Sequence, residues 1–201
     1  MGYQENRYCA FVVQPCHFRG PNELCTTTFV RLDAALVEVE RQRRIFKPII
    51  ILTGDVPYQP GGPTLAALMR SYLEHNGFAG PILFAEGGTG TFTEPRLVTR
   101  LVLRLQARFP GLDQMIVVAS EWQLFAGMPF WEREASKYAL GLDYRWVPGT
   151  GGWRTRLLYR AYGLFLRAAL GSGLWARIEP RLYCLLYRHR YTGGFRMNAC
   201  Q

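Results

Sequence analysis

The sequence predicts an α/β fold: a doubly wound, mostly parallel five-stranded sheet of the Rossmann-like type, with C-terminal helices packed on it. Two observations predict this class. Short apolar runs alternate with helical stretches along the first 149 residues, and such alternation builds parallel sheets with right-handed crossovers. Some runs, such as PIIIL, are apolar without interruption, as is typical of strands covered on both faces. The expected strands are residues 8–13, 48–54, 81–86, 115–120 and 142–147.

A helix is expected after each of the first four strands, because apolar residues recur there at helical spacing. The first helix offers Thr26 to Thr28 as N-caps. The second ends at Gly77, which suits a C-terminal cap. The third has Glu94 and Pro95 in its first turn, where both are favoured. These helices are expected at residues 26–45, 64–77, from about 93, and at about 122–140.

Charge is divided unevenly along the chain. The 201 residues carry a formal charge of +9, but residues 150–201 hold nine arginines and only one acidic residue. We expect residues 1–149 to form a Rossmann-like, ligand-binding core. Residues 150–201 should form a basic, aromatic helical extension of the same domain, with helices at about 153–171 and 174–190.

Arginine mixed with leucine, tyrosine and tryptophan in residues 150–201 is typical of a helix at an anionic membrane surface. The alternative is an ordinary layer packed on the sheet, with the arginine heads reaching into water. Nucleic acid is disfavoured as a partner because no known RNA- or DNA-binding module is present. The chain has no membrane-spanning apolar run and no signal-peptide pattern. We therefore expect a cytoplasmic location, peripheral at the inner face of the membrane.

The five cysteines are odd in number and nowhere spaced as CxxC, which disfavours both zinc ligation and a disulfide framework. No metal site is predicted. Cys16 and His17 are adjacent in PCHFRG, and together they suggest a cysteine-nucleophile hydrolase. Catalytic pairs usually meet across the fold rather than along the chain, so this hydrolase stays an alternative.

Ligands of open α/β sheets bind at the carboxyl ends of the strands. That rule selects residues 14–20, 53–57, 86–93 and 120–123. The third segment, EGGTGTFTEP, is rich in glycine and threonine before a helix start. Backbone N–H groups, the helix N-terminus and threonine hydroxyls can all bind phosphate oxygens. The pattern is neither a Walker motif nor GxGxxG, and the alternative is an ordinary βα turn. Its candidate ligand-binding residues are Gly87, Gly88, Thr89, Thr91 and Thr93.

Other strand ends supply further candidates. Asp55 and Glu86 could bind a ligand hydroxyl, an amine or a hard cation, although Asp55 equally suits a turn. Arg19 could clamp an anion, or it could be a solvated loop side chain. Gly54, Ser120 and Gln123 complete the set of candidate ligand-binding residues.

Several short motifs recur at strand ends and in the helices that follow them. They are Arg31, Ala34 and Ala35 in the first helix, Thr53-Gly54-Asp55, Met69 and Gly77, the spacing of Glu86, Thr89 and Glu94, and Ser120. With these motifs the chain, from about Phe11 to Leu170, resembles the ElyC/SanA/YdcF family, bacterial Rossmann-like proteins of unknown function. It departs from the family pattern at Gln123 and Ala126, where His and Arg are usual.

The resemblance implies cell-envelope or carrier-lipid biology, and for one branch a nucleotide-like ligand or S-adenosylmethionine; it implies no agreed reaction. We therefore expect a protein that binds a phosphorylated or nucleotide-like small molecule, and leave open whether it is an enzyme. The alternatives are a non-enzymatic, membrane-peripheral protein of envelope homeostasis and the cysteine-nucleophile hydrolase.

Overall fold

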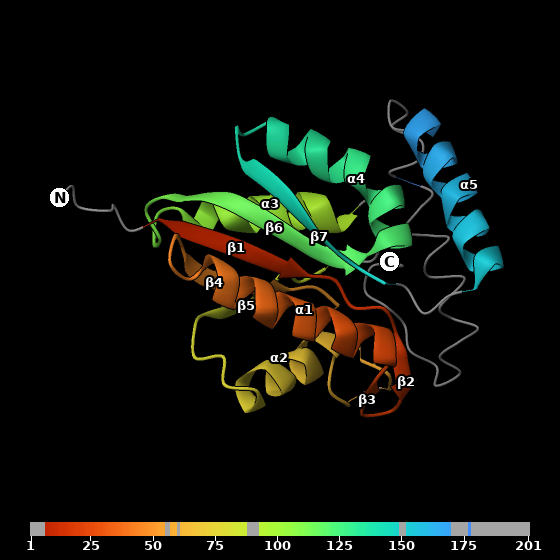
Figure 1. Ribbon diagram of the computed structural model, residues 1–201, viewed down its shortest axis with the longest axis horizontal. Coiled ribbons are helices and arrows are strands. Elements are labelled where there is room, and N and C mark those ends of the chain that lie inside the picture. The colour runs from red at the N-terminus through yellow and green to blue at the C-terminus, as the bar shows by residue number, and fades with distance from the viewer. Residues whose placement is uncertain are drawn as a thin grey trace.

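The computed structural model confirms the α/β class and describes residues 7–54, 57–59, 61–87, 93–148, 152–169 and 177 (Figure 1). Five strands form one sheet in the order β5-β4-β1-β6-β7, and every neighbouring pair is parallel. The strands are β1 (Tyr8–Val13), β4 (Lys47–Leu52), β5 (Ile82–Phe84), β6 (Leu112–Ser120) and β7 (Gly141–Val147).

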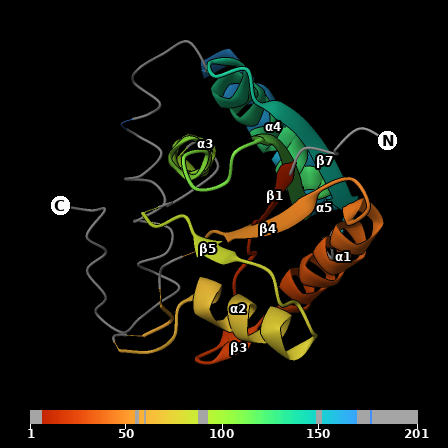
Figure 2. The ribbon, with the colours of Figure 1, turned by 90° about the vertical axis from the view of Figure 1, so that its left-hand side faces the viewer.

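Helices cover both faces of this sheet, as a doubly wound fold requires. Figure 2 shows α1 and α2 on one face and α3 and α4 on the other. Their bounds are α1 (Thr26–Gln42), α2 (Leu65–His75), α3 (Thr93–Leu105) and α4 (Glu121–Ser136). Asn76 is the C-cap of α2, and Gly77 follows it with φ +82°. This left-handed glycine confirms the predicted helix end.

The hydrophobic core has two layers because side chains alternate across each strand. On one face Phe11 and Leu52 pack in a cluster with Leu32 of α1 and Met69 of α2. On the other face the intervening strand residues pack with Val98 of α3 and Trp131 of α4. The uninterrupted apolar runs therefore serve both layers, as the sequence predicts.

Two local features differ from the sequence expectation. The segment between β1 and α1, expected as a loop, contains a short antiparallel hairpin of β2 (Phe18–Gly20) and β3 (Glu23–Leu24). The expected threonine caps of α1 are wrong, because the N-cap is Cys25 and it makes no side-chain capping bond. The hydroxyl of Thr28 instead accepts a hydrogen bond from the backbone N–H of Cys16, at 3.0 Å.

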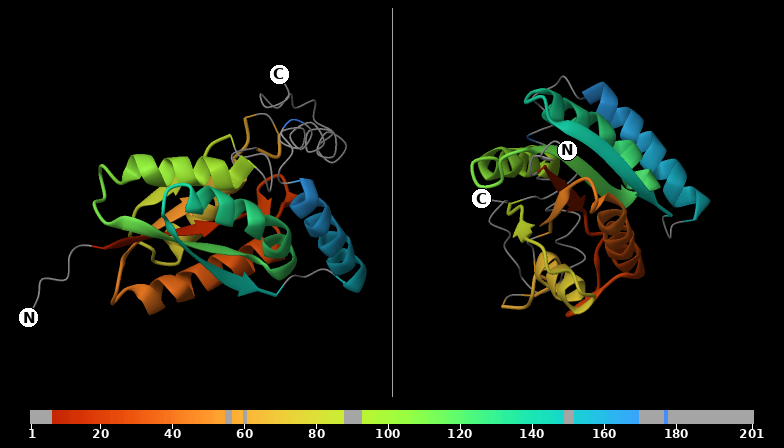
Figure 3. Two further views of the ribbon diagram at one scale, coloured as in Figure 1. Left: turned by 90° about the horizontal axis from the view of Figure 1, so that it is seen from above. Right: turned by 60° about the vertical axis from the view of Figure 1, so that its left-hand side comes forward.

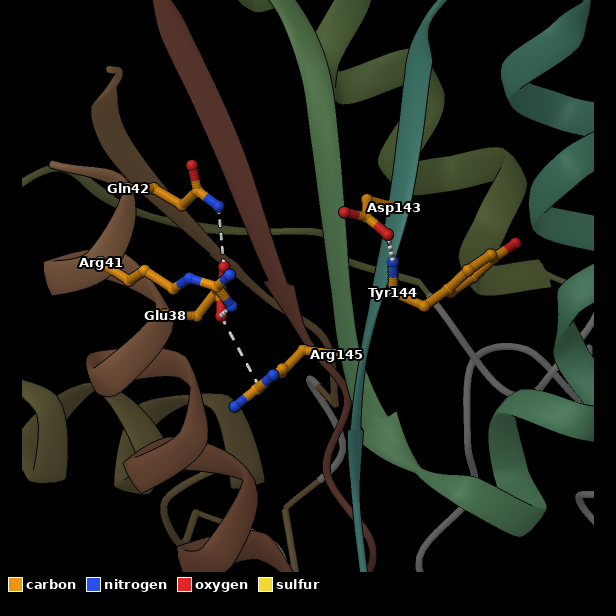
Figure 4. Close-up of polar contacts among 6 residues, drawn as sticks. All are labelled: Glu38, Arg41, Gln42, Asp143, Tyr144 and Arg145. Carbon is orange, nitrogen blue, oxygen red and sulfur yellow. Dashed lines mark hydrogen bonds and ion pairs between the residues drawn. The ribbon is translucent and has the colours of Figure 1, made fainter. Parts of the chain in front are cut away.

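The edge strand β7 is tied to α1 through a buried carboxylate. The Glu38 side chain is 6% exposed, and its Oε2 lies 3.6 Å from Arg145 Nε of β7 and 3.8 Å from Arg41 Nη1 (Figure 4). Its other oxygen accepts a 2.9 Å hydrogen bond from Gln42 Nε2. Beside this cluster, the Asp143 carboxylate accepts from the backbone N–H of Tyr144 at 2.7 Å. The Glu38 cluster stabilises the outer strand.

The C-terminal helix α5 (Trp153–Ala169) lies against α4 at the outside of the molecule (Figure 3). Gly163 is buried at this contact, where a Cβ would come within 3.0 Å of the Phe125 ring and 3.2 Å of Ala126 Cα. The glycine therefore allows the close approach of the two helices. No helix among the described residues is long and apolar enough to cross a membrane. The helix expected at residues 174–190 lies outside the described residues except for residue 177.

Candidate functional site at the reversal of strand order

The strand order reverses at β1. From β1 the chain adds β4 and β5 on one side of the sheet, and then β6 and β7 on the other. The crevice beyond the carboxyl ends of β1 and β6 is where such a fold binds ligands. Gln14 follows β1 and Ser120 ends β6, and the backbone N–H of Gln14 donates to Val118 O at 3.4 Å. The site is therefore built around these two strand ends.

Arg31 of α1 lies at the carboxyl ends of β1 and β6, where it contacts residues of both. Its side chain is completely buried. The guanidinium donates from Nη1 to the carbonyls of Gln14 and Pro15, at 2.7 and 2.8 Å. It also donates from Nε and Nη2 to Ser120 Oγ, at 3.2 and 2.9 Å. One side chain thus joins the loop after β1 to the end of β6 and fixes their relative position.

The positive charge of Arg31 lies at the carboxyl ends of β1 and β6, where it favours a bound anion. Burial lowers the pKa of Arg31, and the thiols of Cys16 and Cys25 and the carboxyl of Glu94 oppose that shift. Arginine stays protonated over the physiological range because its ordinary pKa is above about 12. The carboxylate of Glu94, in the first turn of α3, accepts from Gln14 Nε2 at 2.5 Å. A buried cation and a buried carboxylate therefore flank the strand ends.

Two buried oxygen atoms at the same edge of the sheet have no hydrogen-bond partner among the described residues. They are Oγ1 of Thr53, which follows β4, and Oε1 of Gln123, in the first turn of α4. Buried polar groups of folded proteins are nearly always satisfied. At the carboxyl ends of the strands such groups can complete their hydrogen bonding with a ligand or with water.

The structure brings three of the predicted residues to this edge. Ser120 contacts Arg31, and Gln123 lies one turn further on. Gly54 adopts φ +93°, and a Cβ there would lie 2.6 Å from Pro15 Cγ. The loops after β1 and β4 therefore pack closely, and the glycine is required for that contact.

The other predicted residues are placed differently. Arg19 is exposed on β2 and pairs with Glu23 at 3.3 Å, away from the buried cluster. Glu86 and Gly87 are exposed after the outer strand β5, and Thr93 begins α3 half-buried. Asp55, Gly88, Thr89 and Thr91 lie outside the described residues.

A second cluster of reactive side chains lies beside Arg31. Cys16 Sγ is 3.1 Å from His17 Nδ1, so the two side chains are in contact. Adjacency in the chain did not by itself predict this contact. Cys25 Sγ is 3.4 Å from Thr28 Oγ1. The pKa of Cys25 is lowered to about 4, mainly by a hydrogen bond from Cys16. Hydrogen bonds from Thr28 and from the His17 backbone lower this pKa further, whereas burial raises it. In contrast, burial raises the pKa of Cys9 to about 12.

Sequence reasoning missed the central role of Arg31 and the carboxylate of Glu94 in this site. A signal was present, since Thr27, Arg31 and Glu38 fall at positions i, i+4 and i+11 of one helix. All three therefore lie on one face, and all three are buried. Polar residues on the buried face of a helix indicate a polar partner at the strand ends.

The strand order and the polar groups at its reversal define the class: a Rossmann-like α/β domain with a candidate ligand site at the switch point. Comparison of the chain with protein-family models, with curated proteins and with solved structures finds no match. The resemblance to the ElyC/SanA/YdcF family stays a prediction from the motifs that carry it.

Proposed function

We propose that this protein binds a phosphorylated or nucleotide-like small molecule at the switch point between β1 and β6. The observation that carries this proposal is Arg31, a guanidinium held without exposure beneath the strand ends by Ser120 and two carbonyls. Because it is buried, Arg31 acts through its field and by positioning Ser120. An anion near the strand ends is favoured by this positive charge, part of which the carboxylate of Glu94 already offsets.

The polar groups of the crevice support the same ligand class. The unpartnered Gln123 oxygen can accept a hydrogen bond from a base or ribose hydroxyl. The N-terminus of the 13-residue helix α3 supplies partial positive charge for a phosphate. The glycine- and threonine-rich sequence before α3 is suited to the same role. The family resemblance supports a place in cell-envelope or carrier-lipid metabolism, with a nucleotide or S-adenosylmethionine as the bound molecule.

A thermal-shift panel tests this binding function. The full chain is melted with ADP, S-adenosylmethionine, glucose 6-phosphate and buffer alone. At least one compound should raise the melting temperature, and Gln123→Leu should reduce that rise by weakening the site. Gln106→Leu is the matched control, because Gln106 is also half-buried but donates to Leu112 O at the opposite end of β6. Flat melting curves across the panel, or equal loss in both variants, would refute the proposal.

A second candidate function is contact with an anionic membrane through residues 150–201. The observation that favours it is the outer surface of α5, where large apolar side chains are 54–70% exposed. Exposed arginines lie along the same helix. A helix that combines these two features binds at the interface of anionic bilayers. The apolar residues are Trp153, Leu157, Leu158, Leu164 and Phe165, and the arginines are Arg154, Arg156, Arg160 and Arg167.

Vesicle flotation tests the membrane contact. The full chain should float with phosphatidylserine-containing vesicles more than with pure phosphatidylcholine vesicles. Leu157→Glu should reduce flotation, because it places a charge in the apolar surface of α5. Val37→Glu on α1 is the control, since Val37 is also an exposed aliphatic residue (61%), far along the chain from α5. Equal flotation of the two variants would exclude α5 as the membrane-binding element.

A further inference from the structure

Three side chains with metal-ligating atoms meet at the start of α1. Cys16 and His17 come from the loop after β1, and Cys25 is the N-cap of α1. Their Sγ and imidazole nitrogen atoms all lie within 4.8 Å of one another. It is the one grouping of three or more potential ligands found among the described residues. The sequence disfavoured zinc because the five cysteines are odd in number and nowhere spaced as CxxC.

The backbone around these side chains is fixed by hydrogen bonds. The β2–β3 hairpin returns the chain so that the N–H of Cys25 donates to His17 O at 3.3 Å. The N–H of Cys16 donates to Thr28 Oγ1 at 3.0 Å, and the same hydroxyl contacts Cys25 Sγ at 3.4 Å. Thr28 is fully buried and links both cysteines. This frame is of the kind that orients ligands in metal sites.

We propose that Cys16, His17 and Cys25 bind one zinc ion through two thiolates and one imidazole. Two cysteines and a histidine form a known three-residue zinc set, and it leaves the fourth position for water or a substrate atom. Tetrahedral Zn–S and Zn–N bonds place ligand atoms roughly 3.5–3.8 Å apart. The three ligand atoms already lie within 4.8 Å of one another. The 3.1 Å between Cys16 Sγ and His17 Nδ1 widens to about 3.5 Å by rotation of the exposed His17 side chain.

The local charges favour zinc in this position. Two thiolates neutralise a divalent ion, so the bound site adds no net positive charge beside the buried Arg31. Thiolate and imidazole donors select zinc over calcium and magnesium, which prefer oxygen. The site goes beyond the proposed binding function, and it stands whether or not a nucleotide binds at the crevice.

Metal binding to the full chain tests this site directly. After reduction and removal of metal, the protein is titrated with Co²⁺ as a spectroscopic probe and then with Zn²⁺. One equivalent of Co²⁺ should produce a thiolate-to-cobalt charge-transfer band, and one equivalent of Zn²⁺ should abolish it. Cys16→Ser and His17→Ala should each weaken zinc binding by more than about 100-fold, beyond the roughly 10–100-fold cost of losing a second-shell partner.

Two further variants make the test specific. Cys184→Ser changes a cysteine elsewhere in the sequence and should leave the affinity and the one-to-one stoichiometry unchanged. Because His17 is exposed, His17→Ala should keep the native circular dichroism spectrum, so its loss of binding reports the site rather than unfolding. The proposal is overturned by absence of the charge-transfer band in the reduced protein, or by unchanged zinc affinity in Cys16→Ser and His17→Ala.

Discussion

Replacing Arg31 with methionine should destabilise the fold strongly, because Arg31 holds the two strand ends together. Arg31→Met keeps an apolar stem of similar length but removes all the hydrogen bonds to Gln14 O, Pro15 O and Ser120 Oγ. Each buried oxygen left without a partner costs about 1–3 kcal/mol. Relief from keeping a charge buried offsets part of this loss. We expect the free energy of unfolding to fall by about 3 kcal/mol.

Urea unfolding followed by circular dichroism measures this loss. With a denaturant dependence of about 2 kcal/mol per molar, the midpoint should fall by roughly 1.5 M. Arg44→Met is the control, because Arg44 is exposed just after α1, and such surface substitutions usually change stability by less than about 0.5 kcal/mol. A loss no larger than that of Arg44→Met would refute the role given to Arg31.

A double-mutant cycle separates the Arg31–Ser120 contact from the rest of the effect. Ser120→Ala removes only the hydroxyl that accepts from Nε and Nη2. The two substitutions should be non-additive by about 1–2 kcal/mol, within the roughly 0.5–3 kcal/mol found for residues in one hydrogen-bond network. Strict additivity would show that the contact with Ser120 does not stabilise the site.

Three other predictions concern separate parts of the fold. Gly54→Ala should lower stability by about 2 kcal/mol or more in urea unfolding, because φ is +93° and the new Cβ would lie 2.6 Å from Pro15 Cγ; an unchanged midpoint would contradict the close packing of these loops. Glu38→Ala should cost about 1 kcal/mol, since it removes the buried carboxylate that faces Arg145; hydrogen exchange should rise mainly in β7, and uniform exchange would argue against a local anchor. Burial raises the pKa of the Cys9 thiol from an ordinary 9.0 to about 12, because the folded state favours the protonated thiol. This contribution to stability is fully present below pH 9 and is lost as the pH rises towards 12. Stability should therefore fall over this interval by about 1.4 kcal/mol per pH unit more than in Cys9→Ala, and parallel pH profiles would exclude the effect.

The sequence was sufficient to predict the sheet because its strands have two buried faces. Ile49, Ile50, Ile51 and Leu52 are all fully buried, and their run of apolar side chains needs no tertiary information to be recognised. The alternation of strands and helices predicted a doubly wound sheet, and the structure adds the order of its strands. Predicted strand ends were accurate to a few residues, as with β4, expected to reach residue 54 and ending at Leu52.

The site was less predictable because its contacts are made between residues distant in sequence. Arg31 reaches Ser120 across 89 positions, and Gln14 reaches Glu94 across 80. No local pattern encodes such pairs. The meeting of Cys16 with Cys25 depends on the β2–β3 hairpin, whose strands of three and two residues are too short to produce a clear alternating pattern. Tertiary packing, rather than propensity, also placed Cys25 and not a threonine at the N-cap of α1.

The most direct test of the central claim is to locate a bound nucleotide by amide chemical-shift mapping during titration with ADP. A ligand at the switch point should shift the amides of Gln14, Gly54 and Ser120, which follow or end β1, β4 and β6 at their carboxyl ends. The amides of Lys47 and Leu112, at the opposite ends of β4 and β6, should not move. Shifts confined to that opposite edge, or no shifts with any of ADP, S-adenosylmethionine and glucose 6-phosphate, would contradict the binding site proposed for this fold.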